Sequence, residues 1–395
     1  MTDAPQDFTN LSGNWSYPTT VRFGVGRIRE LASCCETLGM TRPLLVTDPG
    51  LAALPMVADA VAANAEAGLE TGLFSAIKSN PVGRNVEDGL GALHDGGHDG
   101  VIAFGGGSAM DAGKAIAFMA GQTRPIWDFE DVGDNWKRAE TDAIAPVVAV
   151  PTTSGTGSEV GRAAVVIDEE AETKKVIFHP RMLPGVVICD PALVVGLPPQ
   201  ITAATGMDAL AHCLEAFCVD AFHPMADGIA LEGMRLIHDW LPAAYEDGAN
   251  IEARAHMMAA AAMGATAFQK GLGAIHSLSH PVGALYDTHH GLTNAVFMPY
   301  VLAFNRPAVE DKMVRLARFI GLDEPSFQAV LDWTLELRET FRVPETAAGL
   351  GVDPGRLADI AGMAAKDPTA PTNPVPAGTD EMRDILEAAM AGRIG

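Results

Sequence analysis

The first half of the chain alternates short apolar runs with segments of helical periodicity. Four runs rich in β-branched residues, each bounded by turn residues, predict strands that are buried on both faces. These runs cover 43–48, 100–104, 145–150 and 185–190. Helical patterns lie between them, for example at 51–67 and 86–94. Strands that alternate with helices are typical of an α/β domain with a mostly parallel sheet.

The strand signal ends after about Val194. Segments rich in Ala, Leu and Met at 203–219, 227–240, 251–268 and 312–320 predict an all-helical second half. The joint is predicted at Leu197-Pro198-Pro199, because two prolines continue neither a helix nor a central strand. We therefore expect an α/β domain over 1–195 and a helical domain over 196–395, with a proline-rich loop at 367–376 and a last helix from Thr379.

The composition and net charge of the chain limit the kinds of partner that it can bind. With 48% apolar and 19% charged residues, the 395-residue chain has a globular composition. Its 27 Lys and Arg against 50 Asp and Glu give a net charge of −23, which repels nucleic acid and anionic membranes, so we expect neither as a partner. A polyanionic cofactor would need a local site of backbone amides, a helix N-terminus or a well-placed lysine.

Cysteine usage bears on the compartment. The five cysteines are odd in number and lack paired CxxC spacing, which argues against a disulfide framework or a cysteine-based zinc site and favours a reducing cytoplasm. Residues 1–16 lack the basic start and apolar stretch of a signal peptide, and no run of about 18 apolar residues occurs. Nothing in the sequence indicates export or a membrane span.

A glycine-rich segment follows the second predicted strand. Gly105, Gly106 and Gly107 precede Ser108 and a helical pattern that continues to Met119. Glycines let the backbone approach a phosphate closely, and the following helix offers unpaired N–H groups and the positive end of its dipole. The segment is neither GxGxxG nor Walker A, because Lys114 falls deep in the helix. A tight turn without any ligand would use the same residues.

A second segment, Pro151–Glu159, follows the third predicted strand and holds several hydroxyl residues and two glycines. Open α/β sheets bind ligands at such carboxyl ends of strands, although a Ser- and Thr-rich surface turn would look alike. Two segments of this kind favour a nucleotide site. Asp48 ends an early strand, where its carboxylate can accept a hydrogen bond from a ribose hydroxyl and repel a 2′-phosphate, which favours NAD over NADP. The segment Thr-Asp-Pro-Gly is also a good turn without any ligand.

A set of histidines with one aspartate marks the helical half. Asp208 and His212 are four residues apart, so on a helix they share one face. His276, His280 and the pair His289-His290 follow among small and apolar neighbours. One carboxylate and several imidazoles suit Fe²⁺ or Zn²⁺ with a position left for substrate. The alternative is a set of buried structural histidines, one of them paired with Asp208.

These motifs together resemble the iron-containing (group III) alcohol dehydrogenases. The matching segments span most of the chain in family order: 105–114, 151–159, Asp190-Pro191, 197–215, 271–283, His290-Gly291 and Asn294-Ala295. The resemblance implies an N-terminal dinucleotide-binding α/β domain and an all-helical C-terminal domain in a dehydroquinate synthase-like fold, with a metal in the cleft between them. It also implies a homodimer or a larger homo-oligomer.

The resemblance also assigns residues. The metal ligands would be Asp208, His212, His276 and His290, and His280 would be the catalytic histidine near substrate and nicotinamide. The cofactor, NAD with NADP as the alternative, would be bound by Asp48, Asn80, Gly105, Gly106, Gly107, Ser108, Asp111, Thr152, Thr153, Thr156 and Lys174. Lys175 is the alternative to its neighbour Lys174. The metal would be Fe²⁺, with Zn²⁺ as the alternative.

Several positions depart from the family pattern. Gly161 replaces a hydroxyl residue near the cofactor, and His289 replaces the proline usual before the last ligand; we expect His289 to be exposed or to act behind the ligands. Phe268-Gln269-Lys270 and Thr369 border the expected substrate pocket and also differ. The identity of the substrate therefore does not transfer from the family.

The predicted activity is a metal-dependent, NAD(P)-linked alcohol dehydrogenase or aldehyde reductase. We hypothesise that a small primary alcohol binds the open metal position through its oxygen, that hydride passes to nicotinamide C4, and that His280 or water returns the proton in the reverse direction. A maleylacetate-reductase-like enzyme is one alternative. A phosphorylated-polyol dehydrogenase would need several cations near the ligands, where the sequence offers Lys270 and Arg306. A non-catalytic NAD-binding sensor is the third alternative.

Overall fold

The computed structural model describes residues 13–15 and 19–394. Contacts divide the chain into two compact units. The first holds the described residues up to Leu197 together with Gly248–Met258, and the second holds Pro198–Asp247 and the residues from Ala259 onward. The domain division at 195/196 stays a prediction. Of the segment 1–16, on which the absence of a signal peptide was argued, only residues 13–15 belong to the described part.

The described part of the first unit contains a seven-stranded sheet with the order β1-β2-β9-β6-β5-β3-β4. Neighbouring strands are parallel except for β1 and β2. The strands are β1 (Gly13–Trp15), β2 (Thr20–Phe23), β3 (Pro43–Val46), β4 (Gly72–Phe74), β5 (Gly100–Gly105), β6 (Val147–Pro151) and β9 (Val186–Cys189). The predicted mostly parallel sheet is confirmed, and the four predicted runs correspond to β3, β5, β6 and β9.

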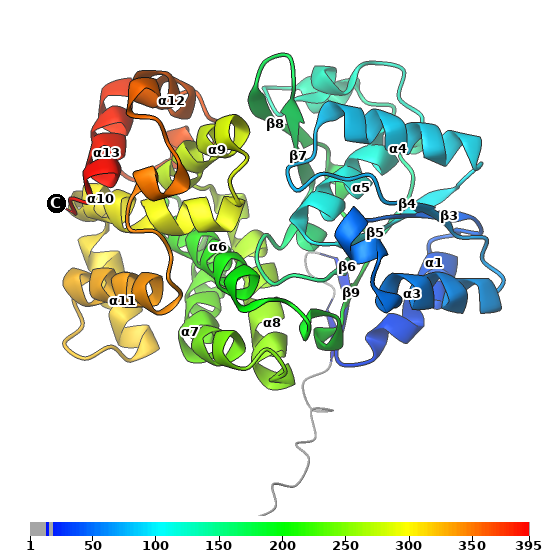
Figure 1. Cartoon of the computed structure of the whole chain (residues 1–395), viewed down its shortest axis with the longest axis horizontal. Coiled ribbons are helices and arrows are strands. Elements are labelled where there is room, and N and C mark those ends of the chain that lie inside the picture. Colours follow the sequence, from blue (N-terminus) through cyan, green and yellow to red (C-terminus); the bar gives the residue numbers. More distant parts are fainter. Residues whose placement is uncertain (1–12, 16–18, 395) are drawn as a thin grey trace, which may run out of the picture. The chain divides into compact units, whose positions relative to one another are not determined.

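Helices cover both faces of this sheet (Figure 1). The central strand β5 shows the division residue by residue. Ile102 and Phe104 belong to a core formed with α1 (Leu31–Thr37) and α3 (Pro55–Glu66). Ala103 instead faces Gly113 of α5 (Gly107–Met119), which packs beside α4 (Gly83–Asp95); a Cβ on Gly113 would lie 2.7 Å from the Ala103 Cβ. Because β5 is covered on both sides, its sequence is continuously apolar.

A two-stranded antiparallel hairpin of β7 (Ala163–Asp168) and β8 (Thr173–Phe178) packs beside α5. The sequence analysis did not predict it. Side chains along β7 alternate between buried and half-buried, which is the pattern of a strand with one covered face. The acidic turn 169–172 between the strands was the available signal.

The parallel register fixes where the sheet presents its loops. Val46 of β3 pairs with Ala103 of β5, and Gly105 of β5 pairs with Pro151 of β6. The residues that follow β3, β5 and β6 therefore emerge side by side at one edge of the sheet. This is the edge at which open α/β sheets bind ligands.

The second unit is built from helices, as predicted. They are α6 (Pro199–Cys218), α7 (Pro224–Glu246), α8 (Ile251–Ala267, whose first part belongs to the first unit), α9 (Ala274–Tyr286), α10 (His290–Ile320), α11 (Phe327–Thr340), α12 (Leu357–Ala364) and α13 (Thr379–Ala391). α6 begins at the predicted proline joint and is buried on all sides from Thr202 to Cys218, packing against α7 and α10. Among the described helices, none combines the length and apolarity that a bilayer span requires.

Candidate functional site

The second unit brings four of the sequence-predicted residues together. One ligand atom from each of Asp208, His212, His276 and His290 lies within 4.8 Å of the others. The first three residues are buried and His290 is half-buried. A compact, buried set of one carboxylate and three imidazoles, left without a cation, would be costly to assemble, and its donor types fit Fe²⁺ or Zn²⁺. The predicted set is thus assembled by the fold, and its role as a metal site is a proposal.

Three helices contribute these side chains. Asp208 and His212 project from one face of α6, His276 lies in the first turn of α9, and His290 is the first residue of α10. Gly291 permits the close approach of α10 to α6: a Cβ there would lie 2.1 Å from the Ala204 carbonyl oxygen. The small residue next to the last ligand therefore sets the distance between the two helices.

The amide of Asn294 lies among the ligand atoms. Its Nδ2 donates to Asp208 Oδ1 at 2.7 Å and lies 3.2 Å from His276 Nε2 and 3.3 Å from His290 Nε2. An amide nitrogen carries two hydrogens, and one goes to Asp208, so Asn294 can donate to one of the two Nε2 atoms at a time. The Nε2 atoms of both imidazoles thus lie near one shared position beside Asp208, as coordination of a cation requires.

A buried carboxylate lies behind His276. Glu215 accepts a hydrogen bond from His276 Nδ1 at 2.5 Å and another from the Ile275 backbone N–H at 2.7 Å. Burial lowers the pKa of His276, but the charge and hydrogen bond of Glu215 outweigh burial and raise that pKa above its usual value. Sequence reasoning missed Glu215. Its signal was the spacing of Asp208, His212 and Glu215 at i, i+4 and i+7 of one helix.

His280 lies beside the four-residue set. Its ring centroid is 5.9 Å from that of His276 and 5.6 Å from that of His290. Its Nδ1 is 2.7 Å from Asp367 Oδ2, and Thr369 donates to the same carboxylate through its backbone N–H and its hydroxyl. Burial opposes ionisation of Asp367, but His280 and the Thr369 hydrogen bonds hold its pKa below the usual range. No local pattern pointed to Asp367, which comes from the proline-rich loop.

Two residues that depart from the family pattern, Phe268 and Lys270, lie in different surroundings. The Phe268 ring lies 5.1 Å from that of His212, so an aromatic residue adjoins the ligand set. Lys270 is buried and donates to Asp227 at 2.6 Å. Arg306 pairs with Glu310. Both cations near the ligand motifs are therefore paired with carboxylates, which argues against a phosphorylated substrate.

In the first unit, the two predicted phosphate-binding segments lie side by side. A Cβ on Gly106 would lie 3.2 Å from Thr153, and one on Gly107 would lie 2.5 Å from Thr156. Gly105 has a φ of +150°, and a Cβ there would meet Ala109 at 2.7 Å. The N-terminus of α5 has no side-chain cap, so its backbone N–H groups are available to an anion.

Other predicted cofactor residues gather around these segments. Asp48 accepts a hydrogen bond from the Leu51 N–H at 2.9 Å and so caps the short helix α2 (Pro49–Ala52). Ser108 donates to the Ser79 carbonyl. Lys174 Nζ donates to Asn80 Oδ1 at 2.9 Å.

The alternative lysine has other partners. Lys175 forms a salt bridge with Asp168 at 2.8 Å and lies 3.7 Å from Glu130. These contacts favour Lys174 over Lys175 as the lysine near the cofactor segments. Thr152, also predicted to bind the cofactor, is buried and donates its backbone N–H to the Gly105 carbonyl at 2.9 Å.

The carboxylate of Asp111 is already engaged. It accepts from the Ser158 hydroxyl at 2.5 Å and from the Val165 N–H at 3.0 Å. The buried Lys114 donates to the Ser158 and Ala163 carbonyls. Asp111 and Lys114 thus tie the second loop to α5, a positioning role that the sequence analysis did not assign. Direct cofactor contact by Asp111 stays a prediction.

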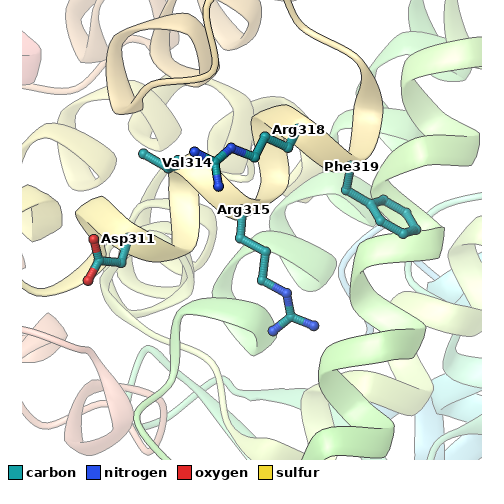
Figure 2. Close-up of a pocket in the computed structure, with 5 residues that line it drawn as sticks. All are labelled: Asp311, Val314, Arg315, Arg318 and Phe319. Carbon is teal, nitrogen blue, oxygen red and sulfur yellow. The ribbon is translucent and has the colours of Figure 1, made fainter.

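A surface pocket on α10 is unrelated to these sites. Figure 2 shows its lining residues Asp311, Val314, Arg315, Arg318 and Phe319. Asp311 follows His290 by 21 residues on the same helix, which corresponds to about 30 Å along the axis. The pocket is therefore remote from the ligand set.

Comparisons with known proteins identify the family. The family "Iron-containing alcohol dehydrogenase" matches residues 18–191, and "Fe-containing alcohol dehydrogenase family, C-terminal" matches residues 202–390. The 4-hydroxybutyrate dehydrogenase of Cupriavidus necator is 40% identical over 386 residues, which cover 95% of this chain and 99% of that protein. The chain belongs to the iron-containing alcohol dehydrogenase family. The predicted resemblance and enzyme class are confirmed.

Solved structures of iron-containing alcohol dehydrogenases and their relatives agree. A 1,3-propanediol oxidoreductase has a TM-score of 0.89 at 33% identity, covering 98% of this chain and all of that one (100%). The sulfoacetaldehyde reductase of Bifidobacterium kashiwanohense, solved in complex with NAD⁺, has a TM-score of 0.85 at 28% identity, covering 94% and 97% of the two chains. The predicted fold class is likewise confirmed.

We predict that Gly291→Ala disrupts the ligand set. The added Cβ would press on the Ala204 carbonyl and on Asp208 Cβ, which lie 2.1 and 2.9 Å away, so α10 must move and take His290 with it. Overpacking of this kind costs about 1–3 kcal/mol. Thermal unfolding and metal analysis measure the effect. Gly228→Ala in α7 is the control, because nothing lies within 4 Å of its Cβ position; equal behaviour of the two variants would contradict the prediction.

We predict that Glu159 makes stability depend on pH. Burial raises the pKa of Glu159 from 4.5 to about 7, although the charge of Lys114 acts in the opposite direction. The Glu159 charge in turn contributes to the raised pKa of the Cys189 thiol. The folded state then binds more protons than the unfolded state between these values, so stability falls as pH rises through that window, by about 3 kcal/mol in full. Urea unfolding of wild type and Glu159→Gln at pH 5 and pH 8 tests this: the variant should gain stability relative to wild type at pH 8. A difference that is the same at both pH values would refute it.

Proposed function

We propose that this iron-containing alcohol dehydrogenase uses NAD and a divalent cation to interconvert small primary alcohols and the corresponding aldehydes. The observation that carries the proposal is the set of Asp208, His212, His276 and His290, three of them buried, with ligand atoms within 4.8 Å of one another. Its ligand types match Fe²⁺, with Zn²⁺ as the alternative. When bound, the cation supplies a Lewis acid for the substrate oxygen, and the nicotinamide supplies the hydride acceptor or donor.

The protein's own residues handle the proton. Oxidation of an alcohol by NAD⁺ gives an aldehyde, NADH and one proton. His280 lies beside His276 and His290, and its Nδ1 is held by Asp367. With Nδ1 so occupied, Nε2 is the atom that accepts the hydroxyl proton and returns it during aldehyde reduction. Asp367 thereby orients the imidazole.

The first unit supplies the cofactor site in this proposal. The backbone of Gly105–Gly107 and the N-terminus of α5 receive the pyrophosphate, and Thr153 and Thr156 border that segment. Lys174, held by Asn80, and Asp48 serve the ribose side. The NAD⁺ complex of the related sulfoacetaldehyde reductase supports NAD as the cofactor.

Other features favour this proposal over its alternatives. The pairing of Lys270 with Asp227 and of Arg306 with Glu310 disfavours a phosphorylated substrate. A non-catalytic sensor has no use for the ligand set, and a maleylacetate-reductase-like enzyme is distinguished by metal dependence. The direct test of the substrate is NADH formation with a panel of alcohols that includes 4-hydroxybutyrate and 1,3-propanediol, the compounds that appear in the names of two relatives.

We also propose a cytoplasmic location. Cys34, Cys35, Cys189, Cys213 and Cys218 are all free and buried, which suits a reducing compartment. The homodimer or larger assembly implied by the family resemblance stays a prediction.

We predict that His276→Ala abolishes both metal content and turnover. Loss of a direct ligand should cost more than the 10- to 100-fold that loss of an outer partner costs. Metal analysis of the purified protein and alcohol-dependent NADH formation measure it. His238→Ala on α7 is the control, since His238 pairs with Asp239 away from the set. If His276→Ala kept its metal and its activity, the proposed site would be wrong.

We predict that Asp48→Ser relaxes the preference for NAD over NADP. Serine can still cap α2, so stability should be preserved while the negative charge is removed. Because like charges brought together cost several kcal/mol, the ratio of kcat/KM for NADP⁺ to that for NAD⁺ should rise about tenfold or more. An unchanged ratio in a folded variant would show that Asp48 does not face the 2′ position.

A further inference from the structure

Glu215 is a buried carboxylate that belongs neither to the ligand set nor to the proton-transfer pair. It lies on α6, one helical turn beyond His212, with 5% of its surface exposed. Burial of a carboxylate is costly unless its oxygens are hydrogen-bonded. Both oxygens of Glu215 are: Oε1 accepts from the Ile275 N–H and Oε2 accepts from His276 Nδ1.

The hydrogen bond from the Ile275 N–H to Glu215 caps the N-terminus of α9. The residue before this helix, Gly273, offers no side-chain cap, so the first backbone N–H groups need partners from elsewhere. Glu215 accepts the Ile275 N–H at 2.7 Å, and Asn373 Oδ1 accepts the Ala274 N–H at 3.0 Å. Two side chains distant in sequence thus cap the helix that carries His276.

The second bond decides the protonation of His276. An ionised carboxylate only accepts hydrogen bonds, so Nδ1 carries a proton, and in the neutral imidazole Nε2 is then bare. The amide donor Asn294 Nδ2, 3.2 Å from His276 Nε2, is compatible with the same tautomer. A bare Nε2 is the form that can bind a cation.

We propose that Glu215 is the positioning residue of the metal centre: its carboxylate caps α9 and locks His276 in the tautomer with a bare Nε2. The inference rests on the metal site proposed above. Only a carboxylate meets both demands. A glutamine has one acceptor oxygen, and if that oxygen serves the Ile275 N–H, its NH₂ faces His276 Nδ1 and drives the proton to Nε2. In the opposite orientation, the NH₂ faces the Ile275 N–H, leaving two buried donors opposed.

The test measures Zn²⁺ binding to chelator-stripped protein by competition with a chromophoric chelator. Glu215→Gln should bind Zn²⁺ 10- to 100-fold more weakly, the usual cost of losing an outer partner of a ligand. Asn373→Ala is the matched control, because it removes the neighbouring cap without touching a ligand. It should lower thermal stability but leave Zn²⁺ affinity close to wild type. Equal loss of affinity in both variants would reduce Glu215 to a helix cap and overturn the proposal.

A second measurement does not require Glu215→Gln to fold. In metal-free wild-type protein labelled with ¹⁵N-histidine, at a pH where the His276 ring is neutral, its signal, assigned by its loss in His276→Ala, should show a protonated Nδ1 and a bare Nε2. A neutral ring with its proton on Nε2 would overturn the proposal. The outcomes also separate the two proposals: Zn²⁺ binding retained in His276→Ala defeats the metal site itself, whereas retention in Glu215→Gln alone defeats only the role of Glu215.

Discussion

The close packing of α10 on α6 is the constraint on which the candidate metal centre depends. Gly291 lies so near the Ala204 carbonyl that no side chain fits between the helices. This approach brings His290 and Asn294, at the start of α10, onto the face of α6 that carries Asp208 and His212. Because α6 is buried on all sides, it gives the set a rigid base.

Three histidines of this site are oriented by polar side chains that contact their Nδ1 atoms. Glu215 holds Nδ1 of His276, Asp367 holds Nδ1 of His280, and the Ser279 hydroxyl lies 3.1 Å from Nδ1 of His290. In each case the partner at Nδ1 leaves Nε2 for chemistry. Two of these partners are carboxylates, yet they serve different ends: one supports a proposed ligand and the other a proposed proton carrier.

The first unit follows a comparable logic at its phosphate-binding segments. Glycines 105–107 supply open backbone, while Asp111 and Lys114 on α5 fix the neighbouring loop through Ser158 and Ala163. Burial lowers the pKa of Lys114, although Asp111 raises it. Through its bonds to the loop carbonyls, Lys114 restricts the position of that loop. Because the chain has a net charge of −23, its surface offers little attraction to an anion, and an anionic cofactor depends on such fixed local segments.

The sequence by itself determined the class of fold, the family and the candidate ligands. Apolar runs such as 100–104 reveal strands covered on both faces, and spacing places Asp208 and His212 on one helical face, because these patterns are local. The β7–β8 hairpin and the continuity of α10 from His290 to Ile320 were not evident, since their signals are interrupted by partial exposure and by prolines. Glu215, Asp367 and Lys114 acquired their roles only in the tertiary structure. Their partners are 61, 87 and 44 residues away, and contacts across such separations arise from the packing of whole helices and loops, which no local pattern encodes.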